Sequence, residues 1–507
     1  MTQEDTRRWT AVGLVTVLGA VLRLTDLGRL SFWIDEMITV CSADAIRDIG
    51  TFLKPACGNM HPPLYFLLVK WWSWGGHDEG WLRLLPAFFG VATVPVVYAL
   101  GCYIAGRRVG MVACVLAACS PFLLLYDREL RMYSLLTLLS TASLLFFLRA
   151  VRQGRSIDWT VFTLLSILNV YVHYHAVLVL LGQGLLGLFW IRRLRNWRPA
   201  VWSLTLIVVA FAFWLPHLIY QLENPDLFNL NASDRFPIID GFGLARFGYL
   251  LYAVALGQTL LPWRPAALVG VVAFGVLGAM GLWRARRQAD LLAIVVATGA
   301  VPILTGFIVS QSMPRYYVFV APIFFVIVAV GWLAIDQLWL RVALGGAAVL
   351  ALGSGLTNYY RGRDFHVLAS VDPWREVGTY LLKHARQGDC LLPIGSFSPV
   401  RYYTNGLAPF TTPVAQDVTS AASCLDADRA RQLWIVAADA ATVTQAANVV
   451  AALDARFVRV DERRFLHDPD YRVKARWFRK SFLEYRVSVY AYRGRPMASM
   501  EPMRKVK

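Results

Sequence analysis

Two adjacent carboxylates, Asp35 and Glu36, follow the first long apolar segment of the chain and come soon after Trp33. A carboxylate pair at such a position could supply a general base, bind a metal ion, or add negative charge near the start of a following helix. The same pair could also be the ordinary polarity of a loop. The choice depends on which other polar side chains the fold brings to the same place.

Other charged, imidazole and phenol side chains lie near the ends of later apolar segments: Lys54, His61, Tyr65, Asp127, Arg128, Glu129, Arg131, Tyr133, His173, His175, Arg315, Tyr316 and Tyr317. Charged groups close to an apolar membrane interior are costly unless they are paired or functional. These residues are therefore the candidates for a site.

Arg128 and Arg131 are three residues apart and would share one face of a helix. Together with Tyr133 they could bind an anion, because a guanidinium group matches the geometry of a phosphate. They could equally form a salt-bridged helix end, with Arg128 paired to Asp127, Glu129 or Glu36. The sequence leaves both interpretations open.

His173 and His175 could be metal ligands or phosphate contacts, although residues two apart do not share a helix face. A His-x-His pair beside tyrosines also fits a purely structural role. Arg315 stands at the start of an apolar segment, where it could contact an anion or anchor the helix among lipid headgroups. Tyr316 fits the aromatic belt of a membrane interface.

The composition is that of a polytopic membrane protein. Of 507 residues, 57% are hydrophobic and only 16% are charged, whereas soluble proteins are nearer to a quarter charged. Several stretches exceed the ~18 apolar residues of a spanning helix. The net charge of +17 indicates basic cytoplasmic loops, so we expect the lipid bilayer and no nucleic acid among the partners.

Charge distribution predicts the topology. Thr6-Arg7-Arg8 precedes a span of about Trp9–Leu27, which places the N-terminus in the cytoplasm and the Asp35-Glu36 loop outside. A short amphipathic helix is predicted over Ala43–Leu53. Phe66–Trp74 and Arg246–Leu261 are predicted to be interfacial helices. If either were a span, arginine clusters would lie outside, against the positive-inside rule.

About eleven transmembrane helices result, with every cluster of three or more arginines in a short loop inside and the carboxylate-bearing loops outside. The ten helices after the first alternate in direction and are Leu84–Ala105, Met111–Leu125, Met132–Leu148, Thr160–Val172, Val177–Ile191, Val201–Ile219, Ala266–Trp283, Leu291–Ser310, Tyr316–Leu333 and Leu340–Leu356. The first outer loop covers residues 28–83 and carries the predicted interfacial helices. The transmembrane domain is predicted to comprise residues 1–357.

Residues 358–507 contain no spanning run and predict a small α/β domain on the outer side. Its expected elements are two helices, over Trp374–Ala385 and Thr442–Leu453, and three strands, over Cys390–Ile394, Leu433–Ala437 and Tyr485–Tyr492. If these segments face an oxidising compartment, the cysteines outside the apolar runs could pair as Cys41–Cys57 and Cys390–Cys424. They could also remain free thiols.

Several short motifs follow one another along the chain in a characteristic order. They are Trp33-Ile34-Asp35-Glu36, His61-Pro62-Pro63-Leu64-Tyr65, Trp81-Leu82-Arg83-Leu84-Leu85-Pro86, Ser120-Pro121 leading to Arg128-Glu129-Leu130-Arg131-Met132-Tyr133, Tyr171-Val172-His173-Tyr174, and Pro314-Arg315-Tyr316-Tyr317. In these motifs the sequence resembles the membrane-embedded GT-C glycosyltransferases. The resemblance is strongest to the bacterial family related to protein O-mannosyltransferases and to the aminoarabinose transferase of lipid A. It covers most of residues 1–357.

The resemblance implies a polyprenyl-phosphate-linked sugar as donor and a site at the outer face. It implies that Asp35 is the base, with inversion at the anomeric carbon, and that Glu36 is the second choice or orients a partner. The family often carries a lysine where this chain has His61, and Lys54 could take that role. Some GT-C enzymes need a divalent cation and others do not, so the metal requirement and any metal ligands stay open.

The residues expected to bind the donor phosphate are Arg128, Arg131, His61, Lys54 and Arg315, and those expected to contact substrate are Tyr65, Tyr133, His173, His175 and Tyr316. A phosphate leaving group needs little acid catalysis, but its developing charge must be stabilised. One carboxylate base and several cations are therefore the minimum set for the reaction.

The sequence thus predicts an inverting glycosyltransferase of the inner (cytoplasmic) membrane, acting on a glycolipid, polysaccharide or protein acceptor. Its C-terminal domain would be periplasmic or extracellular. The alternative is a transporter or flippase of a lipid-linked saccharide. Transporters place charges near the membrane midplane and often contain repeated halves, whereas here the polar groups gather at one predicted face and we find no repeat.

Overall fold

The computed structural model divides the chain into two compact units. Unit 1 comprises Met1–Arg29 and Ile38–Val367, and unit 2 comprises Leu30–Met37 and Leu368–Lys507. The structure describes residues 3–46, 61–193, 196–224, 243–308, 313–363, 373–394, 397–410, 415, 417–427, 432–438, 448–455, 457–466 and 486–493. Lys54 and Cys57 lie outside the described residues.

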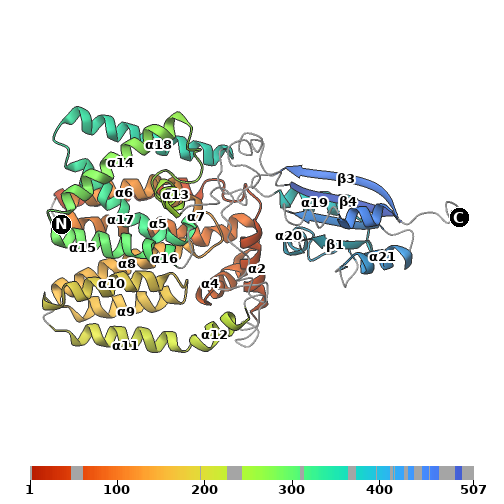
Figure 1. The fold of residues 1–507 in the computed structure, drawn as a ribbon, viewed down its shortest axis with the longest axis horizontal. Coiled ribbons are helices and arrows are strands. Elements are labelled where there is room, and N and C mark those ends of the chain that lie inside the picture. The colour runs from red at the N-terminus through yellow and green to blue at the C-terminus, as the bar shows by residue number, and fades with distance from the viewer. Residues whose placement is uncertain are drawn as a thin grey trace. The chain divides into compact units, whose positions relative to one another are not determined.

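Unit 1 is a bundle of helices (Figure 1). Its helices are α1 (Gln3–Leu24), α4 (Leu64–Trp72), α5 (Glu79–Ala105), α6 (Arg107–Cys119), α7 (Pro121–Asp127), α8 (Tyr133–Gln153), α9 (Ser156–Val170), α10 (Ala176–Phe189), α11 (Arg198–Ala212), α12 (Leu215–Glu223), α13 (Gly243–Leu256), α14 (Pro265–Ala285), α15 (Ala289–Val295), α16 (Val301–Ile308), α17 (Ala321–Leu333) and α18 (Leu338–Arg361). A π-helical turn, Val296–Ala300, joins α15 to α16, and a 3-10 segment, η5 (Pro314–Val320), leads into α17.

Five of the described helices are long and apolar enough to cross a membrane, or up to seven spans if each of two bent helix pairs counts as one. Shorter apolar helices, such as α9 and α10, fall below that length. These results confirm a helical membrane protein. The predicted number of eleven spans remains a prediction.

Prolines break two helices that the sequence predicted to be continuous. The expected span Met111–Leu125 is instead α6 and α7, bent by 56° at Ser120-Pro121. Ser120 is extended and its side chain accepts a hydrogen bond from Leu123 N at 3.2 Å, as an N-cap does. Proline cannot donate to the preceding turn, and it restricts the residue before it, so the chain must start a new helix here. α11 and α12 are bent by 50° in the same way.

The two segments predicted not to span form short helices. α4 has nine residues, a length of about 14 Å against a hydrocarbon core of about 30 Å. The indoles of Trp72 and Trp81 stack at 5.0 Å, and each donates a hydrogen bond to the main-chain carbonyl of the other. α13 has 14 residues. The Trp72–Trp81 pair fixes α4 against the start of α5.

The first loop differs from the prediction. The structure forms helix α2 over Ile34–Ala45, whereas the sequence predicted a loop at Asp35 and Glu36 and a helix over Ala43–Leu53. Residues 47–53 lie outside the described chain. Both carboxylates occupy the first turn of α2, where negative charge is favourable because the main-chain N–H groups are exposed there. The Glu36 carboxylate accepts a hydrogen bond from Trp33 N at 3.2 Å.

Unit 2 contains a four-stranded sheet of order β1-β2-β4-β3 (Figure 1). The strands are β1 (Cys390–Ile394), β2 (Gln432–Ala438), β3 (Val458–Leu466) and β4 (Arg486–Arg493), and the helices are α19 (Trp374–His384), α20 (Phe397–Tyr403) and α21 (Val418–Ala427). β1 and β2 are parallel, and β4 is antiparallel to both β2 and β3.

Both faces of this sheet are buried at β1 and β2. Leu391, Trp434 and Val436 belong to one apolar core, whereas their neighbours Leu392 and Ile435 belong to another. Successive side chains of a strand point to opposite faces, so a continuous apolar run is what a doubly covered strand requires. β1 has the bounds that were predicted for it, and its residues form such a run.

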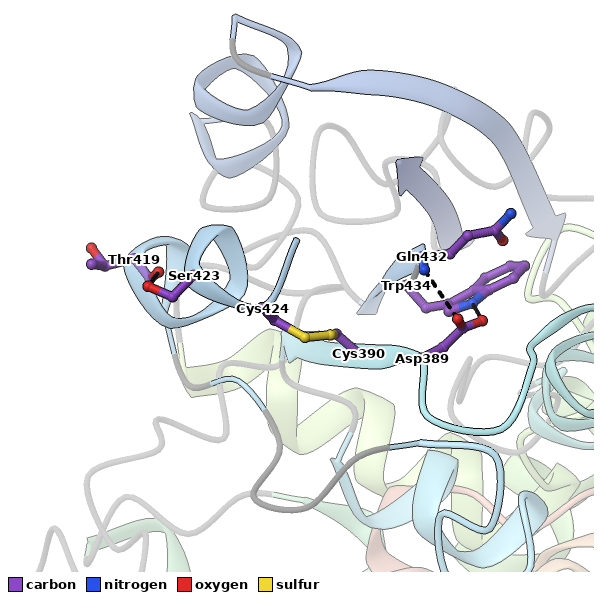
Figure 2. Close-up of a disulfide and its surroundings, with 7 residues drawn as sticks. All are labelled: Asp389, Cys390, Thr419, Ser423, Cys424, Gln432 and Trp434. Carbon is purple, nitrogen blue, oxygen red and sulfur yellow. Dashed lines mark hydrogen bonds between the residues drawn. A yellow bond between two sulfur atoms is a disulfide. The ribbon is translucent and has the colours of Figure 1, made fainter. Parts of the chain in front are cut away.

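Cys390 and Cys424 form a disulfide between β1 and α21 (Figure 2). Cys41 is also disulfide-bonded; Cys57, its suggested partner, lies outside the described residues. Beside the bridge, Asp389 accepts hydrogen bonds from Trp434 Nε1 at 2.9 Å and Gln432 N at 3.0 Å. Disulfides persist in oxidising compartments, which agrees with an outer location for this unit.

Replacing Cys390 and Cys424 by alanine should destabilise unit 2. The bridge spans a sequence separation of 34, and we expect a loss of about 2–4 kcal/mol because the unfolded chain regains conformational freedom. Thermal unfolding of the full chain, followed by tryptophan fluorescence, measures the effect. Cys119→Ala, at a free cysteine, is the control. An unchanged unfolding midpoint in the double variant would contradict this expectation.

Candidate functional site

Four segments of unit 1 that are distant in sequence meet at one cluster of side chains. His61 precedes α4, Tyr133 begins α8, His173 lies between α9 and α10, and Tyr316 lies in η5. The ring centroids of His61 and His173 are 4.8 Å apart, and those of Tyr133 and Tyr316 are each 5.9 Å from His173. The structure therefore brings together residues that the sequence placed only at the ends of separate helices.

His175 completes this cluster. Its ring stacks on Tyr316 at 5.0 Å and lies 4.9 Å from the ring of His173. The backbone N–H of His175 donates to Nδ1 of His173 at 3.0 Å. Because Nδ1 accepts, the neutral His173 ring carries its proton on Nε2. The two histidines of the His-x-His motif therefore contact each other, and each restricts the position of the other.

His173 is held by the end of α9. Its backbone N–H donates to Asn169 O at 3.1 Å, and the Asn169 side chain donates to Ser140 on α8 at 3.0 Å. Leu64 N donates to Tyr171 O at 3.0 Å, which fastens the start of α4 to the same turn. His173 is 1% exposed, and its Nε2 has no hydrogen-bond partner among the residues that the structure describes. It is a buried donor available to a ligand.

Two guanidinium groups act on these imidazoles. Arg131 is 4% exposed, donates from Nη1 to Thr39 Oγ1 at 3.0 Å, and lies 5.9 Å from the Tyr133 ring. Arg315 lies 5.3 Å from the ring of Tyr316. A buried arginine is strongly stabilised by an anionic ligand, with which it can form two parallel hydrogen bonds.

Burial and the neighbouring cations lower the imidazole pKa values. Desolvation, followed by the charges of Arg131 and Arg315, holds the pKa of His61 well below its usual range. Desolvation, the neighbouring histidines and the same arginines do the same for His173. Desolvation lowers the pKa of His175 to about 4. At neutral pH the cluster therefore holds two cations and three neutral imidazoles.

Arg128 occupies a different environment from Arg131. It donates to the main-chain oxygens of Leu22 at 3.0 Å and Asp26 at 2.9 Å, both at the end of α1. Its guanidinium lies over the rings of Tyr359 and Tyr360, at 5.1 and 5.2 Å. Neither of the local carboxylate pairs considered from the sequence is formed. Arg128 instead binds α1 and α18.

Of the remaining predicted residues, Tyr65 is fully buried on the first turn of α4, with its ring edge-to-face on Phe66. Asp35 and Glu36 belong to the segment Leu30–Met37 of unit 2. Within that unit, Phe32 N donates to the Tyr403 hydroxyl at 2.7 Å. Glu36 is fully buried.

Within the described ranges, no group of three or more His, Cys, Asp or Glu side chains could hold a metal ion. His61, His173 and His175 therefore do not form the ligand set that a divalent cation would need.

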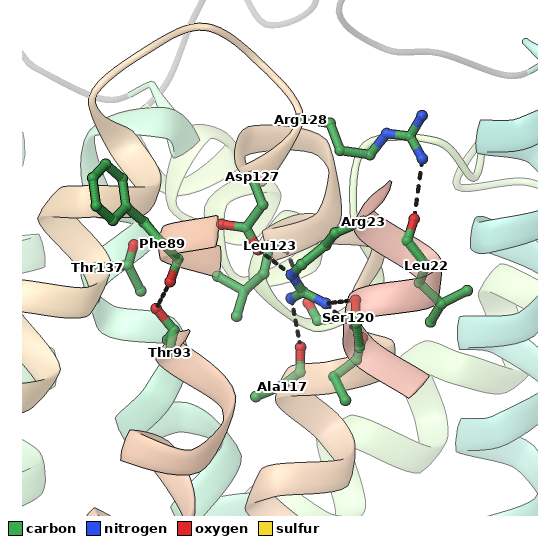
Figure 3. Close-up of polar contacts among 12 residues, drawn as sticks. Leu22, Arg23, Phe89, Thr93, Ala117, Ser120, Leu123, Asp127, Arg128 and Thr137 are labelled. Atoms are coloured by element: carbon green, nitrogen blue, oxygen red, sulfur yellow. Dashed lines mark hydrogen bonds and ion pairs between the residues drawn. The ribbon is translucent and has the colours of Figure 1, made fainter. Parts of the chain in front are cut away.

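One important residue escaped the sequence analysis. Arg23 lies inside the predicted first span, is completely buried, and pairs with Asp127 at 2.8 Å (Figure 3). An arginine within a spanning segment is itself a signal, because it needs a partner at that depth. The identity of that partner, 104 residues later, could not be read from local sequence.

Known proteins share both sequence and fold with this chain. Residues 60–220 match the family described as dolichyl-phosphate-mannose-protein mannosyltransferase. No curated protein sequence matches the chain. Among solved structures, apo ArnT from Cupriavidus metallidurans is similar with a TM-score of 0.60 and 13% identity, covering 96% of this chain and 98% of ArnT. ArnT bound to undecaprenyl phosphate gives a TM-score of 0.57, again at 13% identity, over 94% and 97%.

Two further structures extend the comparison. The oligosaccharyltransferase AglB from Archaeoglobus fulgidus, in complex with an inhibitory peptide and a dolichol-phosphate, gives a TM-score of 0.53 at 10% identity, covering 86% of this chain and 70% of AglB. The arabinofuranosyltransferase AftD from Mycobacteria gives 0.53 at 15% identity, covering 98% of this chain but 40% of AftD.

The fold is therefore similar to the folds of ArnT, AglB and AftD, and the resemblance found in the motifs is confirmed as a resemblance. The family match shows the mannosyltransferase likeness for residues 60–220. The chain thus resembles ArnT and the protein mannosyltransferases.

The neutral imidazoles make the cluster sensitive to acid. Because the folded pKa of His175 is about 4 and the ordinary value is 6.5, the unfolded chain binds more protons between these values, and stability falls as the pH falls through that window. We expect the melting temperature to drop from about pH 7 to about pH 5, and to drop less in His175→Gln. Melting curves across this range measure it. His77→Gln, at an exposed loop residue, should keep the wild-type profile, and a His175→Gln profile as steep as wild type would contradict the assignment.

Proposed function

We propose that this protein is an inverting glycosyltransferase that moves a sugar from a polyprenyl-phosphate carrier to an acceptor hydroxyl at the outer face of the membrane. The observation that carries the proposal is the cluster of Arg131, Arg315 and His173, in which Arg131 and His173 are buried and Arg315 is partly exposed. Two cations and one buried donor, His173 Nε2, which has no hydrogen-bond partner in the described part of the chain, match the needs of a phosphate group. A neutral imidazole adds a hydrogen bond without adding repulsion between cations.

We assign the lipid tail of the donor to an apolar pocket on the same unit. This half-open pocket of about 790 Å³ is lined by residues of α13, α14, α16 and α17, among them Leu251, Phe274, Ile303 and Ile323. Val320, which also lines it, ends the same η5 segment that begins with Pro314 and carries Arg315. A phosphate bound at Arg315 would therefore lie next to an apolar space suited to a polyprenyl chain.

Asp35 is the residue we assign as base. It lies one helical turn before Thr39 on α2, and Thr39 accepts the hydrogen bond from Arg131. Asp35 takes the proton of the acceptor hydroxyl while the oxygen of that hydroxyl attacks the anomeric carbon of the donor sugar. The bond from that carbon to the phosphate oxygen breaks, and the phosphate leaves with the electron pair. Glu36 orients α2 through its bond to Trp33 N, as the second candidate.

The other substrate contacts follow from the cluster. Tyr133, His175 and Tyr316 supply ring faces and polar atoms beside the phosphate site, and we keep Tyr65, on the first turn of α4, as a further proposed substrate contact. His61 lies against His173, where the family often has a lysine. We assign Arg128 to the fold, because its hydrogen bonds go to α1 and Tyr360.

The proposed setting is the inner (cytoplasmic) membrane, with about eleven spans in residues 1–357, the N-terminus inside, and the α/β domain of residues 358–507 outside. The disulfides support the outer location of that domain. ArnT binds undecaprenyl phosphate and AglB binds a dolichol-phosphate and a peptide. By analogy, we propose a lipid-linked donor here and a glycolipid, polysaccharide or protein as acceptor.

Asp35→Asn should abolish transfer in a protein that still folds. We expect the turnover rate to fall by about 10²- to 10⁴-fold, because the amide cannot accept the hydroxyl proton. Mass spectrometry of surface glycans in a deletion strain, complemented with each variant, gives the readout. Asp44→Asn, on the same helix, is the control. Wild-type glycans with Asp35→Asn would show that Asp35 is not the base, and unchanged glycans in the deletion strain itself would remove the transferase function.

Arg131→Gln and Arg315→Gln should each raise the KM for the lipid-linked donor. We expect about a 10- to 100-fold increase, because a hydrogen bond to a charged group contributes about 1.5–3 kcal/mol. The measurement is transfer kinetics with the donor varied in detergent. Arg286→Gln, at an exposed arginine that lies over Trp283, should leave KM unchanged. An unchanged KM in both site variants would place the phosphate elsewhere.

A further inference from the structure

A reciprocal clasp joins α1 to the segment that carries Arg131. Arg23 of α1 donates from Nε to Asp127 Oδ2 at 2.8 Å. Arg128, which follows Asp127 in the sequence, donates a hydrogen bond to the main-chain oxygen of Leu22 on α1 at 3.0 Å. Figure 3 shows both contacts on opposite sides of the α1 end. We call Arg23, Asp127 and Arg128 the α1 clasp.

All three guanidinium nitrogens of Arg23 donate hydrogen bonds. Nη1 donates to Ala118 O at 3.0 Å, and Nη2 to Ala117 O at 3.1 Å (Figure 3). These carbonyls belong to the last turn of α6, whose main-chain oxygens lack partners within the helix because Pro121 starts a new one. Arg23 thus neutralises Asp127 and caps α6 at the same time.

The clasp also leaves Asp127 little freedom. A Cβ atom on Gly90 of α5 would lie 2.3 Å from Asp127 Cγ. The carboxylate therefore occupies a space that exists only because residue 90 is glycine. Side chains of Asp127 and Arg23 are 3% and 0% exposed, so the pair is fixed between α1, α5 and the end of α7.

Arg131 follows Asp127 by four residues in the non-helical turn between α7 and α8. Within this turn, Arg131 N donates to Glu129 O at 2.6 Å. The path of the turn is determined at its start by the clasp and at its end by the first turn of α8. Any shift of Asp127 along α7 would be carried to Arg131.

We propose that Arg23 is a positioning residue that, through Asp127, places the Arg131 guanidinium for binding of the donor phosphate. This inference rests on the proposed function. It assigns the buried ion pair to substrate binding rather than to stability. A buried ion pair can often be replaced by apolar side chains of similar volume without loss of stability, so the two roles can be separated.

The test is the double variant Arg23→Met/Asp127→Leu, which removes both charges together. Gly90→Ala is the second variant, because it displaces the Asp127 carboxylate without changing any charge. Arg149→Met/Asp158→Leu is the matched control: Arg149 and Asp158 pair at 2.9 Å, with Asp158 buried, at the other end of α8. The probe is undecaprenyl phosphate, and undecaprenol is its uncharged counterpart.

We expect the Arg23→Met/Asp127→Leu protein to fold, with a lowered melting temperature because the α6 carbonyls lose their donors. We expect it to bind undecaprenyl phosphate about 10- to 100-fold more weakly, since a small misplacement of a binding group has effects of this size. Binding of undecaprenol should not change. Gly90→Ala should weaken phosphate binding in the same direction, and the control pair should leave it unchanged.

Wild-type affinity for undecaprenyl phosphate in the folded Arg23→Met/Asp127→Leu variant would overturn the proposal. Failure of both clasp variants to yield folded protein would also overturn it, because the clasp would then be a requirement of folding. If instead wild-type protein bound undecaprenyl phosphate no better than undecaprenol, the proposed function itself would fail. The three results are distinguishable in one set of measurements.

Discussion

Positive charge buried among apolar helices needs a compensating partner, and this constraint organises unit 1. Arg23 is compensated by Asp127 and the α6 carbonyls, and Arg128 by the α1 carbonyls and two tyrosine rings. Arg131 and Arg315 are instead surrounded by imidazoles that remain neutral at physiological pH. The bundle thus contains two arginines that bind the α1 and α6 ends, and a cluster of two arginines among neutral imidazoles.

The site exists because helices are interrupted beside it. His61 precedes two prolines and a nine-residue helix, His173 lies in the turn after α9, and Arg315 follows Pro314 in a 3-10 segment. A continuous spanning helix satisfies its own main chain and directs side chains sideways. Interruptions at one end of the bundle allow residues from four segments to face the same small volume.

Sequence reasoning succeeded where the signal was local. The apolar run Cys390–Ile394 predicted β1 because both of its faces are buried, and the short length of α4 and α13 followed from charge and hydropathy. Strand β3 was missed because its alternation is obscured by charged residues and by an irregularity at Arg459. The start of α2 depends on the groups that cap its first turn, and the predicted loop at Asp35 and Glu36 did not take this capping into account.

Non-local partners could not be predicted. Arg128 had equally plausible carboxylates beside it in sequence, yet it binds carbonyls at the end of α1. Arg23 depends on Asp127, more than 100 residues away. The sequence predicted only that His61, His173 and Tyr316 lie at the same face of the membrane. The structure shows that the ring centroids of His61 and Tyr316 each lie within 6 Å of that of His173. Motif order predicted the resemblance, and packing showed which cations lie beside the histidines.

The most direct test is a density map of the full chain in lipid nanodiscs with undecaprenyl phosphate bound. The account predicts phosphate density in contact with the side chains of Arg131, His173 and Arg315, and tail density in the apolar cavity between α13, α14, α16 and α17. Phosphate density away from these three side chains, for example at the basic helix ends of the predicted cytoplasmic face, would contradict it.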